Sequence, residues 1–164
     1  MVRFVTICAL LLALFACSQQ QETTSSSGSD EAKKVEQQII VSDEVKAGWS
    51  AVKLMVKDLE KESEAVYTVP IGSSFKIPGS ELRVAVDTFL PNFIITDGNI
   101  TSRGLSTENP AVLIRVTEDD NQVFKGWLFE LFQRSQSFSH PRYQLNLTGF
   151  VETVKKATAP VKKG

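Results

Sequence analysis

Few residues in this 164-residue chain have side chains that could act as catalysts or bind metals. Its two cysteines, Cys8 and Cys17, lie near the N-terminus, and its only histidine is His140. The rest of the chain cannot form a disulfide, a thiolate metal site or a covalent haem attachment, and we expect no metal and no other cofactor. His140 could act as a catalytic base with one of many serines, or could bind a ligand. Because no G-x-S-x-G motif accompanies it, the simpler interpretation is a structural histidine that bonds loop backbone.

An aromatic run at residues 124–132, FKGWLFELF, is the most unusual cluster in the sequence. Its rings would lie on both faces of a strand, which suits either a strand buried on both sides or one that lines a groove. Gly126 would let another backbone or a large ring approach closely. The alternatives are simple core packing and an aromatic binding groove. In the second case the candidate binding residues are Trp127, Phe129 and Tyr143 on the groove wall, together with His140.

The N-terminal segment has the features of an export signal. Arg3 is followed by an almost unbroken apolar run over residues 4–16, which is too short to cross a membrane as a helix. The run ends in Leu14-Phe15-Ala16-Cys17, which resembles the signal box of bacterial lipoproteins, where the cysteine is lipidated and becomes the new N-terminus. We therefore expect lipidation of Cys17; the alternative is an ordinary secretory signal that contains a cysteine. Ser18 occupies the position where lipoproteins retained in the inner membrane carry aspartate, which favours the outer membrane.

Composition divides the chain into four parts. Residues 1–16 are the expected signal peptide, and residues 17–38, rich in Ser, Gln, Thr and charge, predict a flexible tether. Residues 39–153 are expected to form a single all-β domain, and the lysine-rich residues 154–164 a disordered basic tail. The formal net charge of −1 argues against a nucleic-acid partner.

Within the expected domain, apolar and polar residues alternate with a period of two, as in half-buried strands. Such segments recur with turn signals and without convincing helices between them, which predicts an antiparallel β-sandwich or a barrel-like domain. Residues 43–62 also fit a helical period behind a possible cap at Asp43, but we choose a strand over 49–58 that forms a hairpin with residues 65–67. The other expected strands cover residues 66–71, 75–77, 82–87, 93–96, 99–102, 111–116, 123–131 and 143–148.

The strongest hairpin signal is Asp97-Gly98, between Ile94-Ile95-Thr96 and Asn99-Ile100-Thr101. A type I′ turn needs positive φ at both central residues, and the Asp-Gly pair is among those that adopt it most readily. Pro78-Gly79 and residues 118–121 predict further turns.

The aromatic run and the segment after it also resemble a known family. The matching pieces are Phe124-x-Gly126-Trp127-Leu128-Phe129, His140-Pro141-x-Tyr143-x-Leu145-x-Leu147, Tyr67-Thr68-Val69-x-Ile71-Gly72 and Phe75-Lys76-Ile77. They are similar to a family of exported proteobacterial proteins of unknown function, many of them lipoproteins, over roughly residues 49–152. The resemblance implies an exported domain and brings no activity with it.

A fainter similarity concerns the extracytoplasmic domain of the ResB-type membrane protein of cytochrome c assembly. It is carried by Phe89-Leu90-Pro91-x-Phe93 and Asn109-Pro110-Ala111-Val112, with Trp127-Leu128-Phe129 further on. The match is short and does not include that protein's membrane helices, so its haem-handling role is not transferred to any residue here.

Together these features predict a lipid-anchored bacterial envelope protein that faces the periplasm and binds rather than catalyses. The expected partners are the membrane, through the N-terminal lipid, and an envelope protein; an accessory role in cytochrome c maturation is one option. The alternatives are a domain that binds a small molecule or a glycan through the same aromatics, and a hydrolase that uses His140.

Overall fold

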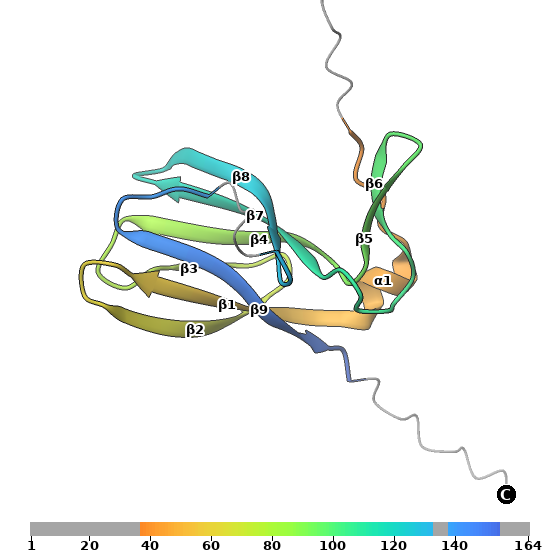
Figure 1. Ribbon diagram of the computed structural model, residues 1–164, viewed down its shortest axis with the longest axis horizontal. Helices are drawn as coiled ribbons and strands as arrows, with labels where there is room; N and C mark the ends of the chain where they lie inside the picture. Colours follow the sequence, from red (N-terminus) through yellow and green to blue (C-terminus); the bar gives the residue numbers. More distant parts are fainter. Residues whose placement is uncertain (1–36, 133–137, 155–164) are drawn as a thin grey trace, which may run out of the picture. The chain divides into compact units, whose positions relative to one another are not determined.

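The computed structural model describes residues 37–132 and 138–154, where nine strands and one short helix follow one another along the chain (Figure 1). The predicted signal peptide, the lipidation of Cys17, most of the tether and all but Val154 of the basic tail lie outside the described residues. Within the described ranges, no helix is long and apolar enough to cross a membrane.

The described strands form two larger antiparallel sheets and one hairpin, which confirms the prediction of an all-β antiparallel domain; of the two predicted forms, it is the sandwich. The first sheet, in the order β2-β1-β9, contains β1 (Trp49–Asp58), β2 (Ser63–Pro70) and β9 (Tyr143–Glu152). The second, in the order β3-β4-β7-β8, contains β3 (Ser74–Lys76), β4 (Leu82–Leu90), β7 (Ala111–Glu118) and β8 (Asn121–Phe129). The separate hairpin consists of β5 (Phe93–Thr96) and β6 (Asn99–Ser102).

The two larger sheets share one hydrophobic core. Leu54 and Leu147 from the first sheet, and Ile114 and Leu128 from the second, are completely buried in it. Burial of such a side chain contributes about 1.5–3 kcal/mol relative to leaving it in water. This core fixes which face of each strand points inward, and therefore which side chains remain outside.

Residues 43–62 contain both of the structures that their pattern allowed. The helix α1 (Asp43–Gly48) comes first, and the predicted strand follows it as β1, which confirms the strand over residues 49–58. The helix is capped by Ser42, whose hydroxyl oxygen accepts a hydrogen bond from the backbone N–H of Val45 at 3.3 Å, rather than by Asp43.

The β5–β6 hairpin has the predicted turn, with φ of 49° at Asp97 and 76° at Gly98. Its bounds agree with the two predicted strands, because the two-residue turn fixes the register that pairs Thr96 with Asn99. The predicted turn between β7 and β8 also has positive φ at both central residues, Asp119 and Asp120.

The chain leading to α1 pairs with this hairpin as a short parallel segment. Ile39 forms a bridge with Ile100 of β6, and the Ile100 backbone accepts from Ile40 N–H and donates to the Gln38 carbonyl, both at 2.8 Å. Figure 1 shows the segment, in orange, beside β6. Gln38, predicted as the last residue of the tether, is therefore already bound to the domain.

Candidate functional site

Three aromatic side chains gather on the outer face of the second sheet, and we call Phe93, Trp127 and Phe129 the aromatic patch. Side chains alternate along a strand, so the burial of Leu128 in the core turns its neighbours Trp127 and Phe129 to the other face. The Phe93 ring on β5 lies edge to face with both, at centroid distances of 5.1 Å to Trp127 and 5.0 Å to Phe129. The patch therefore joins β8 to the hairpin.

The aromatic patch rests on a second, smaller apolar layer. Trp127 lies opposite Leu113 of β7, and Phe129 lies opposite Ala111. Both β7 residues are buried, yet neither belongs to the core between the two large sheets. Trp127 and Phe129 themselves are only half-buried.

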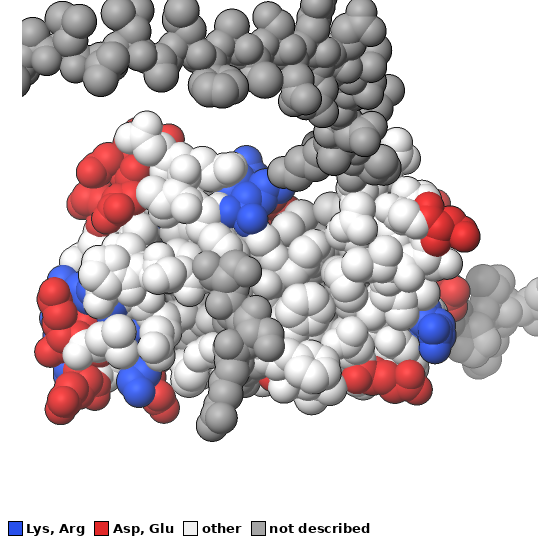
Figure 2. Space-filling model, turned by 45° about the horizontal axis from the view of Figure 1, so that its top comes forward, with Lys and Arg blue, Asp and Glu red and all other residues white. Residues whose placement is uncertain are grey.

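The aromatic patch lies beside charged side chains on the same face of the sheet. Lys125 lies two residues before Trp127 on β8, opposite Arg115 of β7, and both are exposed. Figure 2, which turns the top of Figure 1 forward, shows uncharged surface over much of the middle of the view, with one group of Lys and Arg side chains within it and most other charged groups toward the two ends. The chain continues from β8 into Leu131 and Phe132, whose exposed fractions are 61% and 56%. Large apolar side chains this exposed are typical of interaction surfaces when they adjoin one another.

Tyr143 does not join the aromatic patch. It is 3% exposed and packs in the core between the two large sheets, because the first residue of β9 points inward with Leu145 and Leu147. The predicted groove with Trp127, Phe129 and Tyr143 on one wall is therefore not formed. Pure core packing of Trp127 is not observed either, since Leu128 occupies the core position.

Gly126 has the role that its place in the aromatic run predicts. A Cβ atom at this position would lie 2.6 Å from Cζ of the Phe124 ring, so that the ring covers the glycine. Phe124 in turn packs edge to face with Phe138, at a centroid distance of 5.4 Å. The close approach of a large ring is therefore confirmed, on the core side of β8.

His140 binds loop backbone, as the simpler interpretation predicts. Its Nδ1 accepts hydrogen bonds from the backbone N–H groups of Arg142 and Tyr143, both at 3.1 Å. Its Nε2 lies 3.7 Å from a carboxylate oxygen of Glu118. The two hydrogen bonds to Nδ1 hold the backbone turn that leads into β9.

An ion pair that sequence analysis missed holds the same end of the sandwich. Arg142 donates two hydrogen bonds to the Asp58 carboxylate, at 3.0 Å and 2.7 Å, and its guanidinium lies 5.0 Å from the centroid of the Tyr143 ring. These hydrogen bonds lower the pKa of Asp58 from 3.8 to about 2, and they raise the pKa of Arg142. The partners are 84 positions apart, so no local pattern could have revealed the pair.

A buried asparagine fixes the hairpin that carries Phe93. Asn92 is 4% exposed, and its side-chain amide donates to Ser106 Oγ at 2.8 Å and to Glu108 Oε2 at 3.1 Å. Its backbone N–H donates to Ser102 Oγ at 3.1 Å. Buried polar groups satisfied in this way specify one arrangement, so the aromatic patch is held in place before any ligand binds.

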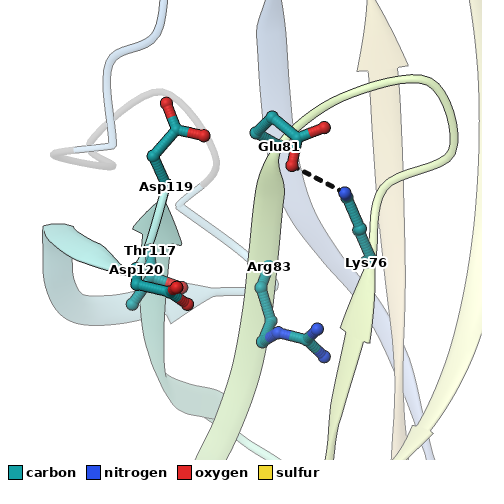
Figure 3. A pocket seen from close by; sticks show the side chains of 6 residues that line it. All are labelled: Lys76, Glu81, Arg83, Thr117, Asp119 and Asp120. Atoms are coloured by element: carbon teal, nitrogen blue, oxygen red, sulfur yellow. Dashed lines mark hydrogen bonds and ion pairs between the residues drawn. The ribbon is translucent and has the colours of Figure 1, made fainter.

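A charged hollow and a larger, partly apolar hollow lie on the surface away from the aromatic patch. One, of about 250 Å³, lies between the β3–β4 and β7–β8 turns and is charged (Figure 3). In it, Lys76 pairs with Glu81 at 2.7 Å, and the Asp119 carboxylate points away from Arg83. The other, of about 580 Å³, lies beside α1 and is lined in part by Trp49 and Leu105. Both are open to solvent, and the described residues contain no group of three or more His, Cys, Asp or Glu side chains that could hold a metal.

Comparisons with known proteins add no assignment. No protein-family model matches the chain, and neither the curated proteins nor the solved structures gave a significant match.

Proposed function

We propose that this protein is a lipid-anchored module of the bacterial envelope that docks a periplasmic protein partner through the aromatic patch. The observation that carries the proposal is the placement of Phe93, Trp127 and Phe129 outside the main core, half-buried and next to exposed apolar side chains. Aromatic side chains dominate the binding energy of protein interfaces when they lie centrally in an apolar surface with a polar rim.

The way in which the patch is held also favours a binding role. Asn92 fixes the hairpin through satisfied buried hydrogen bonds, and Phe93 is fixed further because Asn109 donates to its carbonyl oxygen at 2.9 Å. A surface that is already ordered loses little conformational entropy when a partner binds. Less of the binding energy from the aromatic rings is then offset by the ordering of the surface.

The location of the module follows from the N-terminal sequence. The segment Leu14-Phe15-Ala16-Cys17 resembles the lipoprotein signal box, and the order of signal, tether and domain supports a location of the patch on the periplasmic side of a membrane. An accessory role in cytochrome c maturation is a narrower form of the same proposal, and it rests on the similarity to the ResB-type domain.

In-cell photocrosslinking would test the docking role. A photoreactive amino acid replaces exposed Phe132, and a matched control replaces Val66, which is 58% exposed on β2 of the other sheet. We expect the probe at position 132 to capture one envelope protein, the capture to disappear with Trp127→Ala, and the probe at position 66 to capture nothing in common with it. Equal capture at both positions, or capture unaffected by Trp127→Ala in a folded protein, would contradict the docking role.

The same variants separate the alternative functions. If glycans or small molecules are the ligands, the purified chain should bind them with a change in tryptophan fluorescence that Trp127→Ala removes, and crosslinking should find no protein. If the protein is a hydrolase, His140→Ala should abolish function while the protein stays folded. A cell fractionation of the Cys17→Ser variant tests the anchor, because this variant should leave the membrane fraction.

A further inference from the structure

Three isoleucines form a row across the hairpin and the segment that pairs with it. Ile95 of β5 lies opposite Ile100 of β6, and Ile100 forms the parallel bridge with Ile39. Directly paired residues place their side chains on the same face of a sheet, so Ile39, Ile100 and Ile95 share one face, which we call the isoleucine row.

The two ends of the isoleucine row are exposed. Ile100, in the middle, is 8% exposed, whereas Ile39 is 40% and Ile95 is 55% exposed. Between Phe93 and Ser102 the only charged side chain is that of Asp97, which lies in the turn. The hairpin therefore carries its only charge in the turn, away from the isoleucine row, and no described element of the domain covers the row's ends.

The expected lipid anchor leads directly into this surface. The chain that runs from Cys17 meets the domain at the segment whose carbonyl at Gln38 accepts from Ile100. About 20 residues separate the anchor from that segment, so its distance from the membrane surface cannot exceed about 70 Å, and its average distance in a flexible chain is about 25 Å. Of all described segments, the one carrying Ile39 has the shortest chain path to the lipid.

We infer that the isoleucine row rests on the surface of the phospholipid bilayer that holds the anchor, an inference that depends on the proposed lipidation of Cys17. Exposed apolar side chains favour the boundary between headgroups and acyl chains, where they are removed from water. The contact alone would be weak, but the tether keeps the row at a high local concentration next to lipid, so a weak contact is enough to orient the domain. Phe93 belongs to the same hairpin, and the orientation would hold the aromatic patch close to the membrane.

A depth-sensitive label tests this contact. Lipidation consumes the Cys17 thiol and signal cleavage removes Cys8, so an introduced cysteine is the only free thiol of the mature chain. Ile95→Cys and the control Val66→Cys replace β-branched residues of similar exposure, 55% and 58%, on different sheets. Each full-length lipidated variant is labelled with an environment-sensitive fluorophore and reconstituted into phosphatidylethanolamine–phosphatidylglycerol vesicles that contain a lipid-borne quencher.

The expected result is a blue shift and a loss of about half of the emission for the label at position 95, with little change at position 66. Equal quenching at both positions, or none at position 95 in protein that floats with the vesicles, overturns the inference and leaves the anchor intact. Protein that carries no lipid and does not float refutes the lipidation itself. A response at position 95 that requires added envelope proteins would also overturn the inference, because it would identify the row as a protein contact.

Discussion

Replacing Trp127 and Leu128 separately by alanine measures whether the two faces of β8 differ as the structure indicates. Leu128 is completely buried between the two large sheets, so Leu128→Ala should lower the free energy of unfolding by about 3–5 kcal/mol, in the upper part of the range for such changes. Trp127 has the larger side chain but is only half-buried on the outer face.

The expected loss of stability for Trp127→Ala is smaller, because the indole is not fully buried. Removal of a fully buried tryptophan costs about 3–5 kcal/mol, and Trp127 keeps part of its surface in water. The cost of its removal includes the edge-to-face contact with Phe93, which is worth about 0.5–1.5 kcal/mol. We therefore expect a loss of about 2–3 kcal/mol, which is less than for the smaller but completely buried leucine.

Urea unfolding of the two variants, each in a Cys17→Ser background, would give these free energies. Trp49 is 7% exposed and remains in both variants, so its emission reports the unfolding of the core. With a slope of about 2 kcal/mol per molar, Trp127→Ala should lower the midpoint by about 1–1.5 M and Leu128→Ala by about 1.5–2.5 M. A loss for Trp127→Ala equal to or above that for Leu128→Ala would show that the indole is a core residue, and the proposed patch would be wrong.

Three further predictions concern single contacts. Hydrogen bonds from Arg142 hold the pKa of Asp58 near 2. The pair therefore stabilises the fold fully above about pH 4 and loses this contribution as the pH falls toward 2. In urea titrations, the stability difference between wild type and Asp58→Asn should shrink over that interval. Gly126→Ala should cost about 1–3 kcal/mol through its clash with the Phe124 ring, and a cost that persists undiminished in a Phe124→Leu background would reject that cause. Asn92→Ala removes two side-chain hydrogen bonds and should cost about 1–3 kcal/mol, with hydrogen exchange accelerated in the β5–β6 hairpin before the sandwich strands.

The two strands joined by Asp97-Gly98 show how a local chemical signal fixes the ends of a strand. The bounds of β5 and β6 agree with prediction because Asp97-Gly98 selects one turn, and the turn sets the register. Alternation alone locates a strand less well: β8 runs over Asn121–Phe129 where residues 123–131 were expected, since apolar residues continue beyond the point at which pairing with β7 ends.

The candidate site was predicted only in part, and the reason lies in the pattern of β8 itself. Phe124 and Leu128 on one face, and Trp127 and Phe129 on the other, are all apolar, so a period of two gives no indication of which face is inside. Tyr143 was expected beside them because it is close in sequence to the run. It lies instead in the opposite sheet and points into the core.

The hairpin covers part of the outer face of β8, and its position depends on contacts between residues that are distant in the sequence. The Asp97-Gly98 turn makes the hairpin, but the turn has no influence on where the hairpin packs. Its place is fixed by Asn92, whose amide reaches side chains 14 and 16 positions away, and these bring Phe93 onto Trp127. The loop that carries Ser106 and Glu108 has no local pattern that would reveal its contact with Asn92. The aromatic patch thus depends on the buried Asn92 amide together with the backbone of Phe93, which Asn109 binds, and Asn92→Ala should weaken partner capture at position 132 even where the sandwich itself stays folded.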